Sequence, residues 1–222
     1  MVNVLLESYK IDEPYLYDEL KRYIKAEHRV AIVAFSFRDS QVKSLEDWND
    51  FYSPEYGLYY ESIVGALLSY GILEENISFI NYYADTKETA AEKVKKADVV
   101  YFLGGLPDKM MERIKEFELY GILLEHKGVI MGYSAGALIQ LSEYHLSPDK
   151  DYPNFVYCEG LPYLNDFYLE VHYAGEQVQN ESIARVLRER NKTVYATLLH
   201  SGTVLVDNGR IKLLGDVKAF EK

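Results

Sequence analysis

One short segment, G-Y-S-A-G at residues 132–136, has the residue types and spacing that suit covalent chemistry. It follows the apolar run Val129–Met131 and precedes the apolar run Leu138–Leu141. G-x-S-x-G between a strand and a helix is typical of a nucleophile elbow, a sharp turn that exposes the serine hydroxyl beside a helix N-terminus. Free N–H groups at that terminus can stabilise an oxyanion. We therefore expect Ser134 to be a nucleophile, in preference to a serine that only caps a helix.

A pair of glycines offers further oxyanion donors. Gly104 and Gly105 directly follow the apolar run Val99–Leu103. At the C-terminal end of a parallel strand, glycines let backbone N–H groups approach a ligand closely. If the two strands are neighbours, the amides of Gly105 and Ala135 form a two-donor oxyanion hole. The glycines also suit a simple turn into a helix that begins near Pro107.

A serine nucleophile needs a base, and the chain has five histidines. His172 lies in the alternating run Phe167–Tyr173, which reads as a strand. Its competitor is His200, at the end of the apolar run Val194–Leu199. The other three histidines lie at expected helix ends or in an expected loop: His28, His126 and His145.

The composition excludes several classes of protein. The chain has 222 residues and a net charge of −11, without a Lys/Arg cluster that could hold a phosphate backbone, so nucleic-acid binding is not expected. Its single cysteine, Cys158, excludes an internal disulfide, and no two His or Cys are spaced as metal ligands usually are. No stretch is long and apolar enough to span a membrane, and the N-terminus does not resemble a signal peptide. We expect a cytoplasmic protein of one domain, residues 1–222, without a metal or cofactor.

Alternating elements must position these residues. Short apolar runs rich in β-formers predict strands, and segments with helical spacing separate them. This order favours a three-layer α/β/α sandwich with a mostly parallel central sheet. The expected strands are Val2–Leu6, Val30–Phe35, Ile77–Tyr82, Val99–Leu103 and Val129–Tyr133, and the expected helices are Tyr15–Ile24, Tyr59–Tyr70, Lys87–Lys96 and Lys109–Glu118.

After about residue 150 the pattern changes. Strands are expected at Phe167–Tyr173 and Val194–Leu199, with a helix at Glu181–Arg190 between them. The turn at residues 207–209, Asp-Asn-Gly, predicts a hairpin between Thr203–Val206 and Arg210–Leu214, because Asn-Gly tolerates the positive φ angles of a type I′ turn.

These motifs together resemble the dipeptidase E (aspartyl dipeptidase)/cyanophycinase family of serine peptidases. The resemblance rests on the glycine pair, on G-Y-S-A-G-A at residues 132–137, and on G-L-P at 160–162 leading into V-H-Y at 171–173. It implies a fold like that of class I glutamine amidotransferases, with serine in place of the cysteine nucleophile. It also implies Ser134 as nucleophile, His172 as base, and the amides of Gly105 and Ala135 as oxyanion donors.

The chain departs from the family pattern at three positions. Leu106-Pro107 follows the glycine pair, where the family commonly has Asn or Asp. The acidic member of the triad is expected just before the glycine of the last hairpin, where residues 200–202 read His-Ser-Gly. Either a Ser–His dyad works alone, or another group such as Glu170 or Glu176 orients His172. The arginine expected to bind an acidic side chain after the histidine is also absent, since none precedes Arg185. We therefore expect a peptidase for short peptides whose preference is not strictly for Asp.

Two other functions remain as alternatives. An α/β-hydrolase esterase would use His200 as base with an acid from Asp166, Glu170 or Glu176. A binding or regulatory protein on the same scaffold would follow from a decayed site. The tyrosine-rich stretch Phe51–Tyr60 is expected to pack at the surface or in an interface, such as that of a homodimer, in preference to contacting substrate.

Overall fold

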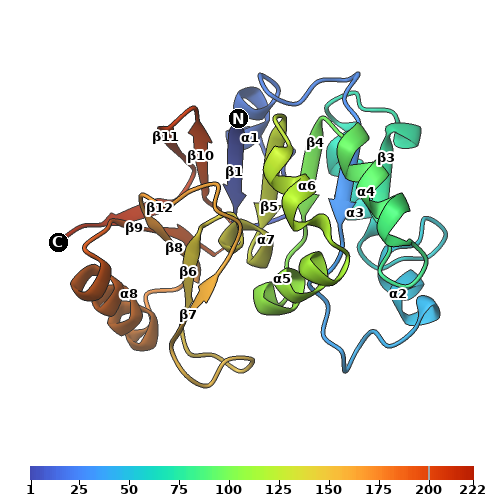
Figure 1. Ribbon diagram of the computed structural model, residues 1–222. Helices are drawn as coiled ribbons and strands as arrows, with labels where there is room; N and C mark the ends of the chain where they lie inside the picture. The colour runs from blue at the N-terminus through green and yellow to red at the C-terminus, as the bar shows by residue number, and fades with distance from the viewer. Residues whose placement is uncertain (200) are drawn as a thin grey trace.

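A seven-stranded sheet forms the centre of the structure, a computed structural model that describes residues 1–199 and 201–222 (Figure 1). The strand order is β11-β10-β1-β5-β4-β2-β3. The five strands from β1 to β3 in this order run parallel, and β10 and β11 extend the sheet as an antiparallel hairpin. The strands are β1 (Val2–Leu6), β2 (Val30–Val33), β3 (Ile77–Ile80), β4 (Val99–Phe102), β5 (Val129–Tyr133), β10 (Thr203–Asp207) and β11 (Arg210–Leu214).

Helices cover both faces of this sheet, which gives the three layers that the sequence predicts (Figure 1). The inner strands are apolar at almost every position because both faces are buried. One core contains side chains of α4 (Lys87–Lys96), α5 (Pro107–Glu116), α6 (Leu119–Glu125) and α7 (Ala135–Leu138). The other core contains side chains of α1 (Pro14–Leu20), α2 (Leu45–Tyr52) and α3 (Tyr60–Leu68). The sequence patterns did not predict α2, and of α6 they predicted only a helix end at His126.

The C-terminal third adds two small sheets beside the main one (Figure 1). One has the order β12-β9-β8 and packs against α8; the other is the hairpin β6-β7. Neither the β6-β7 hairpin nor β12 was expected. The elements are β6 (Glu143–Leu146), β7 (Val156–Glu159), β8 (Tyr168–Tyr173), α8 (Gln177–Arg190), β9 (Val194–Leu198) and β12 (Val217–Phe220). None of the helices in the described residues combines the length and the apolar character needed to cross a membrane.

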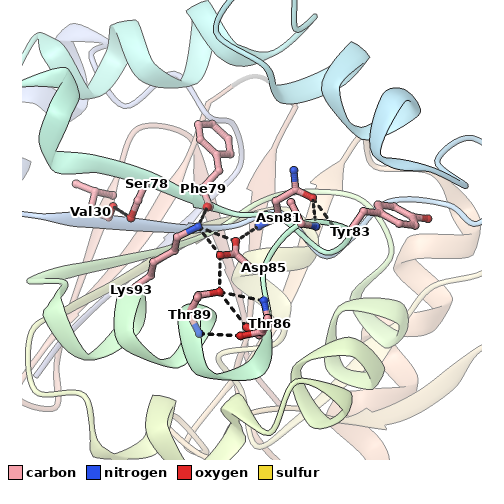
Figure 2. Close-up of polar contacts among 10 residues, drawn as sticks. Val30, Ser78, Phe79, Asn81, Tyr83, Asp85, Thr86, Thr89 and Lys93 are labelled. Atoms are coloured by element: carbon pink, nitrogen blue, oxygen red, sulfur yellow. Dashed lines mark hydrogen bonds and ion pairs between the residues drawn. The ribbon is translucent and has the colours of Figure 1, made fainter.

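The corner between β3 and α4 shows how polar side chains fix an edge of the sheet (Figure 2). Thr86 and Thr89 form a capping box that satisfies N–H groups at the start of α4. The Asp85 carboxylate accepts hydrogen bonds from the Asn81 N–H at 2.7 Å, from the Thr89 hydroxyl at 2.8 Å and from Lys93 Nζ at 2.6 Å. Every donor in this cluster comes from the same β–turn–α unit, so these hydrogen bonds stabilise the local structure of the corner.

Candidate active site

Ser134 lies at the carboxyl end of β5, in the turn that leads into α7. Its φ of 53° and ψ of −116° lie in a region that non-glycine residues seldom occupy, and such strain is concentrated at functional sites. The turn requires the two flanking glycines. A Cβ on Gly132 would lie 2.2 Å from the Gly136 carbonyl oxygen, and one on Gly136 would lie 2.2 Å from that of Phe102. The motif therefore forms the strained elbow that its sequence predicts.

His172 faces Ser134 from β8. Its ring Nε2 lies 2.7 Å from Ser134 Oγ, within hydrogen-bonding distance. The pairing of β8 with β9 shifts register between Glu170 and Tyr173, and His172 within this irregularity has a φ of 55°. Bulges of this kind turn a side chain away from its regular direction. The irregular strand thus directs the imidazole to the serine.

On the side of the ring opposite Ser134, the His172 imidazole contacts Glu7. The sequence analysis did not consider Glu7 as an acid for His172. The Glu7 carboxylate hydrogen-bonds His172 Nδ1 and accepts a bond from the His172 backbone N–H at 2.9 Å. The hydroxyl of Thr197 on β9 donates to the same carboxylate at 2.6 Å. The Glu7 side chain is only 1% exposed. Ser134, His172 and Glu7 therefore form a hydrogen-bonded series in which the carboxylate fixes the orientation of the imidazole.

The carboxylates proposed from the sequence lie elsewhere. The Glu170 carboxylate accepts hydrogen bonds from Ser147 Oγ at 2.8 Å and from His145 Nε2 at 2.7 Å, not from His172. His145 lies in β6 and is buried, so its expected place in a loop is wrong. Glu176 is the residue before α8, and among the described residues it makes no hydrogen bond with His172. A hydrogen bond between Glu170 or Glu176 and His172 is therefore not what orients the imidazole.

The strand register explains why Glu7 reaches the site. Strands β1 and β5 are parallel neighbours, with Leu6 opposite Tyr133, and the Ser134 N–H donates to the Leu6 carbonyl at 3.0 Å. The next residues, Glu7 and Ser134, therefore leave the sheet side by side. In the sequence, the signal for Glu7 is a carboxylate directly after a buried strand. It identifies the acid only if one knows that β1 lies next to β5.

The glycine pair approaches the same point from β4, the other neighbour of β5. Gly105 has a φ of 139°, and a Cβ there would lie 2.3 Å from the Ser36 carbonyl oxygen, so only glycine fits. Ala135 is the first residue of α7 and has no partner for its N–H within that helix. The N–H groups of Gly105 and Ala135 donate to no other described residue, so both are free to bind an oxyanion.

The surroundings of His172 favour its protonated form. Burial alone would lower the pKa of His172, but the hydrogen bond and negative charge of Glu7 act in the opposite direction. Together with the charges of Glu170 and Asp149 they hold the pKa above its ordinary value of 6.5. The neutral imidazole, which can accept a proton from Ser134, is therefore fully formed only at a pH above that raised pKa.

Ser134 and His172 open into a cavity of about 360 Å³. Phe51, Tyr52 and Tyr59 of the tyrosine-rich stretch line it, while Tyr56 is exposed. The preference for surface or interface packing over substrate contact stays a prediction. The competing base, His200, lies outside the described residues. Within those residues no group of three or more His, Cys, Asp or Glu side chains is arranged to hold a metal ion.

A strained serine, a histidine in contact with it and a buried carboxylate behind the ring define a serine-type hydrolase on an α/β sandwich. The sequence model of peptidase family S51 matches residues 53–214 of the chain. The chain therefore belongs to peptidase family S51, the dipeptidase E/cyanophycinase family, and is a serine-type peptidase. Comparison with curated proteins finds no match.

Two solved structures share the fold along nearly the whole chain. A peptidase E protein of Listeria monocytogenes EGD-e is 18% identical, with a TM-score of 0.66 and 96% of both chains covered. A peptidase from an acI-B1 actinobacterium is 16% identical, with a TM-score of 0.63, and the match covers 99% of this chain and 93% of that one. At these identities the likeness establishes the α/β fold with its mostly parallel central sheet.

Proposed function

We propose that this peptidase hydrolyses short peptides through an acyl-enzyme on Ser134. One observation carries the proposal: Ser134 Oγ, His172 and Glu7 form a continuous hydrogen-bonded series at the end of the parallel sheet. This is the arrangement that activates a serine hydroxyl at a pH near neutrality.

The steps follow from the positions of these groups. Ser134 Oγ attacks the scissile carbonyl carbon while its proton passes to His172 Nε2. The amides of Gly105 and Ala135 bind the oxyanion of the tetrahedral intermediate. The C–N bond then breaks, and the imidazolium donates its proton to the leaving amine. A water molecule gives a proton to His172 and attacks the ester carbonyl. The ester C–O bond then breaks, the second product leaves, and the imidazolium returns the proton to Ser134 Oγ.

Glu7 acts in this scheme as a positioning residue. Its carboxylate holds the Nδ1–H tautomer of His172, so that Nε2 is the nitrogen able to accept the serine proton. It also stabilises the imidazolium that forms in each half of the reaction. No cofactor takes part. A homodimer and a cytoplasmic location stay predictions from the sequence.

Covalent labelling tests the proposal. A small fluorophosphonate should add once to the wild-type protein, with loss of fluoride, as seen by intact-mass spectrometry. The adduct should be absent from Ser134→Ala and His172→Ala. Ser147→Ala is the matched control and should label as the wild type does, because the Ser147 hydroxyl donates to Glu170 and hydrogen-bonds no histidine among the described residues. A wild-type protein that does not label, or one that labels equally after Ser134→Ala, would refute the proposal.

A further inference from the structure

The cavity beside Ser134 has a cluster of aromatic side chains in its walls, together with polar residues such as Ser36 and Gln41. Six rings contribute, and we call this space the aromatic cavity: Tyr9, Phe37, Phe51, Tyr52, Tyr59 and Tyr133. Its volume of about 360 Å³ lies at the lower end of the range for small-ligand pockets, roughly 300–1,000 Å³. Space of this size suits one large side chain with the backbone atoms next to it.

The rings are fixed against one another and against the chain. Tyr133 meets Tyr9 edge to face at 5.6 Å between ring centroids, and Phe51 stacks on Tyr59 at 5.9 Å. The Tyr133 ring lies so close to Gly104 that a Cβ there would be 2.3 Å from Tyr133 Cε2. The aromatic wall thus begins at the residue directly before the nucleophile and is already formed without a ligand.

The charges around the cavity disfavour binding of an acidic substrate side chain. Among the described residues that line it, Arg38 is the only lysine or arginine, and its guanidinium is engaged by both oxygens of Asp151. Burial raises the pKa of Tyr52 and of Tyr133, so these phenols stay neutral at physiological pH. The buried carboxylate of Glu7 adds a negative charge at the same cavity. Among the described lining residues, a substrate carboxylate would find no lysine or arginine without a carboxylate partner.

We infer that the aromatic cavity binds a large apolar side chain, aromatic above all, on the residue whose carbonyl Ser134 attacks. The inference rests on the proposed function, since it assigns the substrate class of that same site. The side chain of the acyl residue branches one atom from the attacked carbon. Two cavities include Ser134 and Gly105, an expected oxyanion donor, and the aromatic cavity is the larger, at about 360 Å³ against about 230 Å³. Burial of an apolar side chain against preformed rings is favourable and needs no charged partner.

Aminoalkyl diphenylphosphonates test the inference, because they carry only the acyl-side residue. Ser134 Oγ forms a bond to phosphorus and phenoxide leaves, so the rate reports the fit of the side chain alone. Probes with the Phe, Leu and Asp side chains should label in that order, with Phe at least about tenfold faster than Asp. Equal rates, or a faster Asp probe, would overturn the inference.

A plain fluorophosphonate has no side chain to bind, so it tests the serine mechanism separately from the role of the aromatic cavity. If it labels Ser134 while none of the three side-chain probes does, the aromatic cavity is not the acyl pocket and the serine mechanism stands. If it does not label at all, the proposed function and this inference both fall.

Two variants probe the walls of the cavity. Tyr59→Ala should lower the ratio of Phe to Asp labelling rates about tenfold, because it removes a ring of the wall. Tyr56→Ala is the matched control from the same stretch, since Tyr56 is 61% exposed and lies outside the cavity lining. Thermal melting of both variants shows whether each remains folded.

Asp151→Asn provides a gain of function that does not depend on removing a ring. It leaves the Arg38 guanidinium without its carboxylate partner, so the Asp probe should label about tenfold faster than with the wild type. Asp166→Asn, at an exposed aspartate without an ion pair among the described residues, should leave all rates unchanged. An unchanged Asp rate in Asp151→Asn would show that Arg38 does not control the choice between acidic and apolar side chains.

Discussion

Two Ser, His and Glu clusters lie close together around β8, and they differ in the order of their contacts. In the first, Ser134 contacts His172 and His172 contacts Glu7. In the second, both the imidazole of His145 and the hydroxyl of Ser147 contact the carboxylate of Glu170.

The difference in order decides what each cluster can do. Ser147 has no base among the described residues, because its hydroxyl donates to the Glu170 carboxylate and the His145 imidazole hydrogen-bonds the same oxygen. The two histidines also differ in exposure: the His172 side chain is 47% exposed and opens to a cavity, whereas that of His145 is fully buried. The same three residue types thus give an activated serine only where the imidazole lies between the other two and meets solvent.

Of the variants that test this comparison, Glu7→Gln should lose the most activity. The amide cannot hold the Nδ1–H tautomer of His172 as a carboxylate does, so kcat/KM and the fluorophosphonate labelling rate should both fall about 10³- to 10⁴-fold. The acid limb of the pH profile should also shift to lower pH, because Glu7 is the main group that raises the pKa of His172. The matched variant is Glu170→Gln. If the two variants lose activity equally, the distinction between the clusters fails.

The pH profile of the wild-type protein is the second test. The base must be neutral, and its pKa lies above 6.5, so activity should rise with pH through that raised value. At pH 5.5 labelling should be less than about one tenth of the plateau rate, because the imidazole is then almost wholly protonated. An acid limb below 6.5 would contradict the influence of Glu7 on His172. Circular dichroism at each pH excludes unfolding as the cause.

Thr197→Val should produce an intermediate loss. The change keeps the shape of a fully buried side chain but removes the hydroxyl that donates to Glu7 at 2.6 Å. The carboxylate keeps its two bonds to His172, so kcat/KM should fall only about two- to tenfold, the usual range for one hydrogen bond. Thr203→Val, at a buried threonine whose hydroxyl has no partner among the described residues, is the control. A loss as large as that of Glu7→Gln would mean that Thr197 supports the site through more than this bond.

Glu170→Gln should have the smallest effect on activity and a clear effect on stability. It replaces a buried acceptor of two hydrogen bonds, so the free energy of unfolding should fall by about 1–3 kcal/mol. Denaturant titration measures this loss. Activity should change less than about threefold, with a small downward shift of the acid limb, because the Glu170 charge also raises the pKa of His172. A stable but inactive variant would place Glu170 in the catalytic machinery after all.

Much of the fold could be predicted because its signals are local. The runs at β1 and β5 and the helix α4 appear with the predicted bounds, and Asn208 and Gly209 have the positive φ angles expected of the hairpin turn. Short or weakly patterned elements such as α2 and the β6-β7 hairpin were not predicted. Their side chains become buried only where other parts of the chain cover them.

The sequence by itself determined the elbow around Ser134, the glycine turn at Gly105 and a histidine on a later strand. These depend on spacing within one strand and one turn, which backbone geometry fixes locally. Only the tertiary structure decided which carboxylate orients His172. Glu7 is 165 residues away in the chain and arrives through the pairing of β1 with β5 and the irregular pairing of β8. No local pattern encodes such a contact, because strand order and register follow from the packing of the whole sheet.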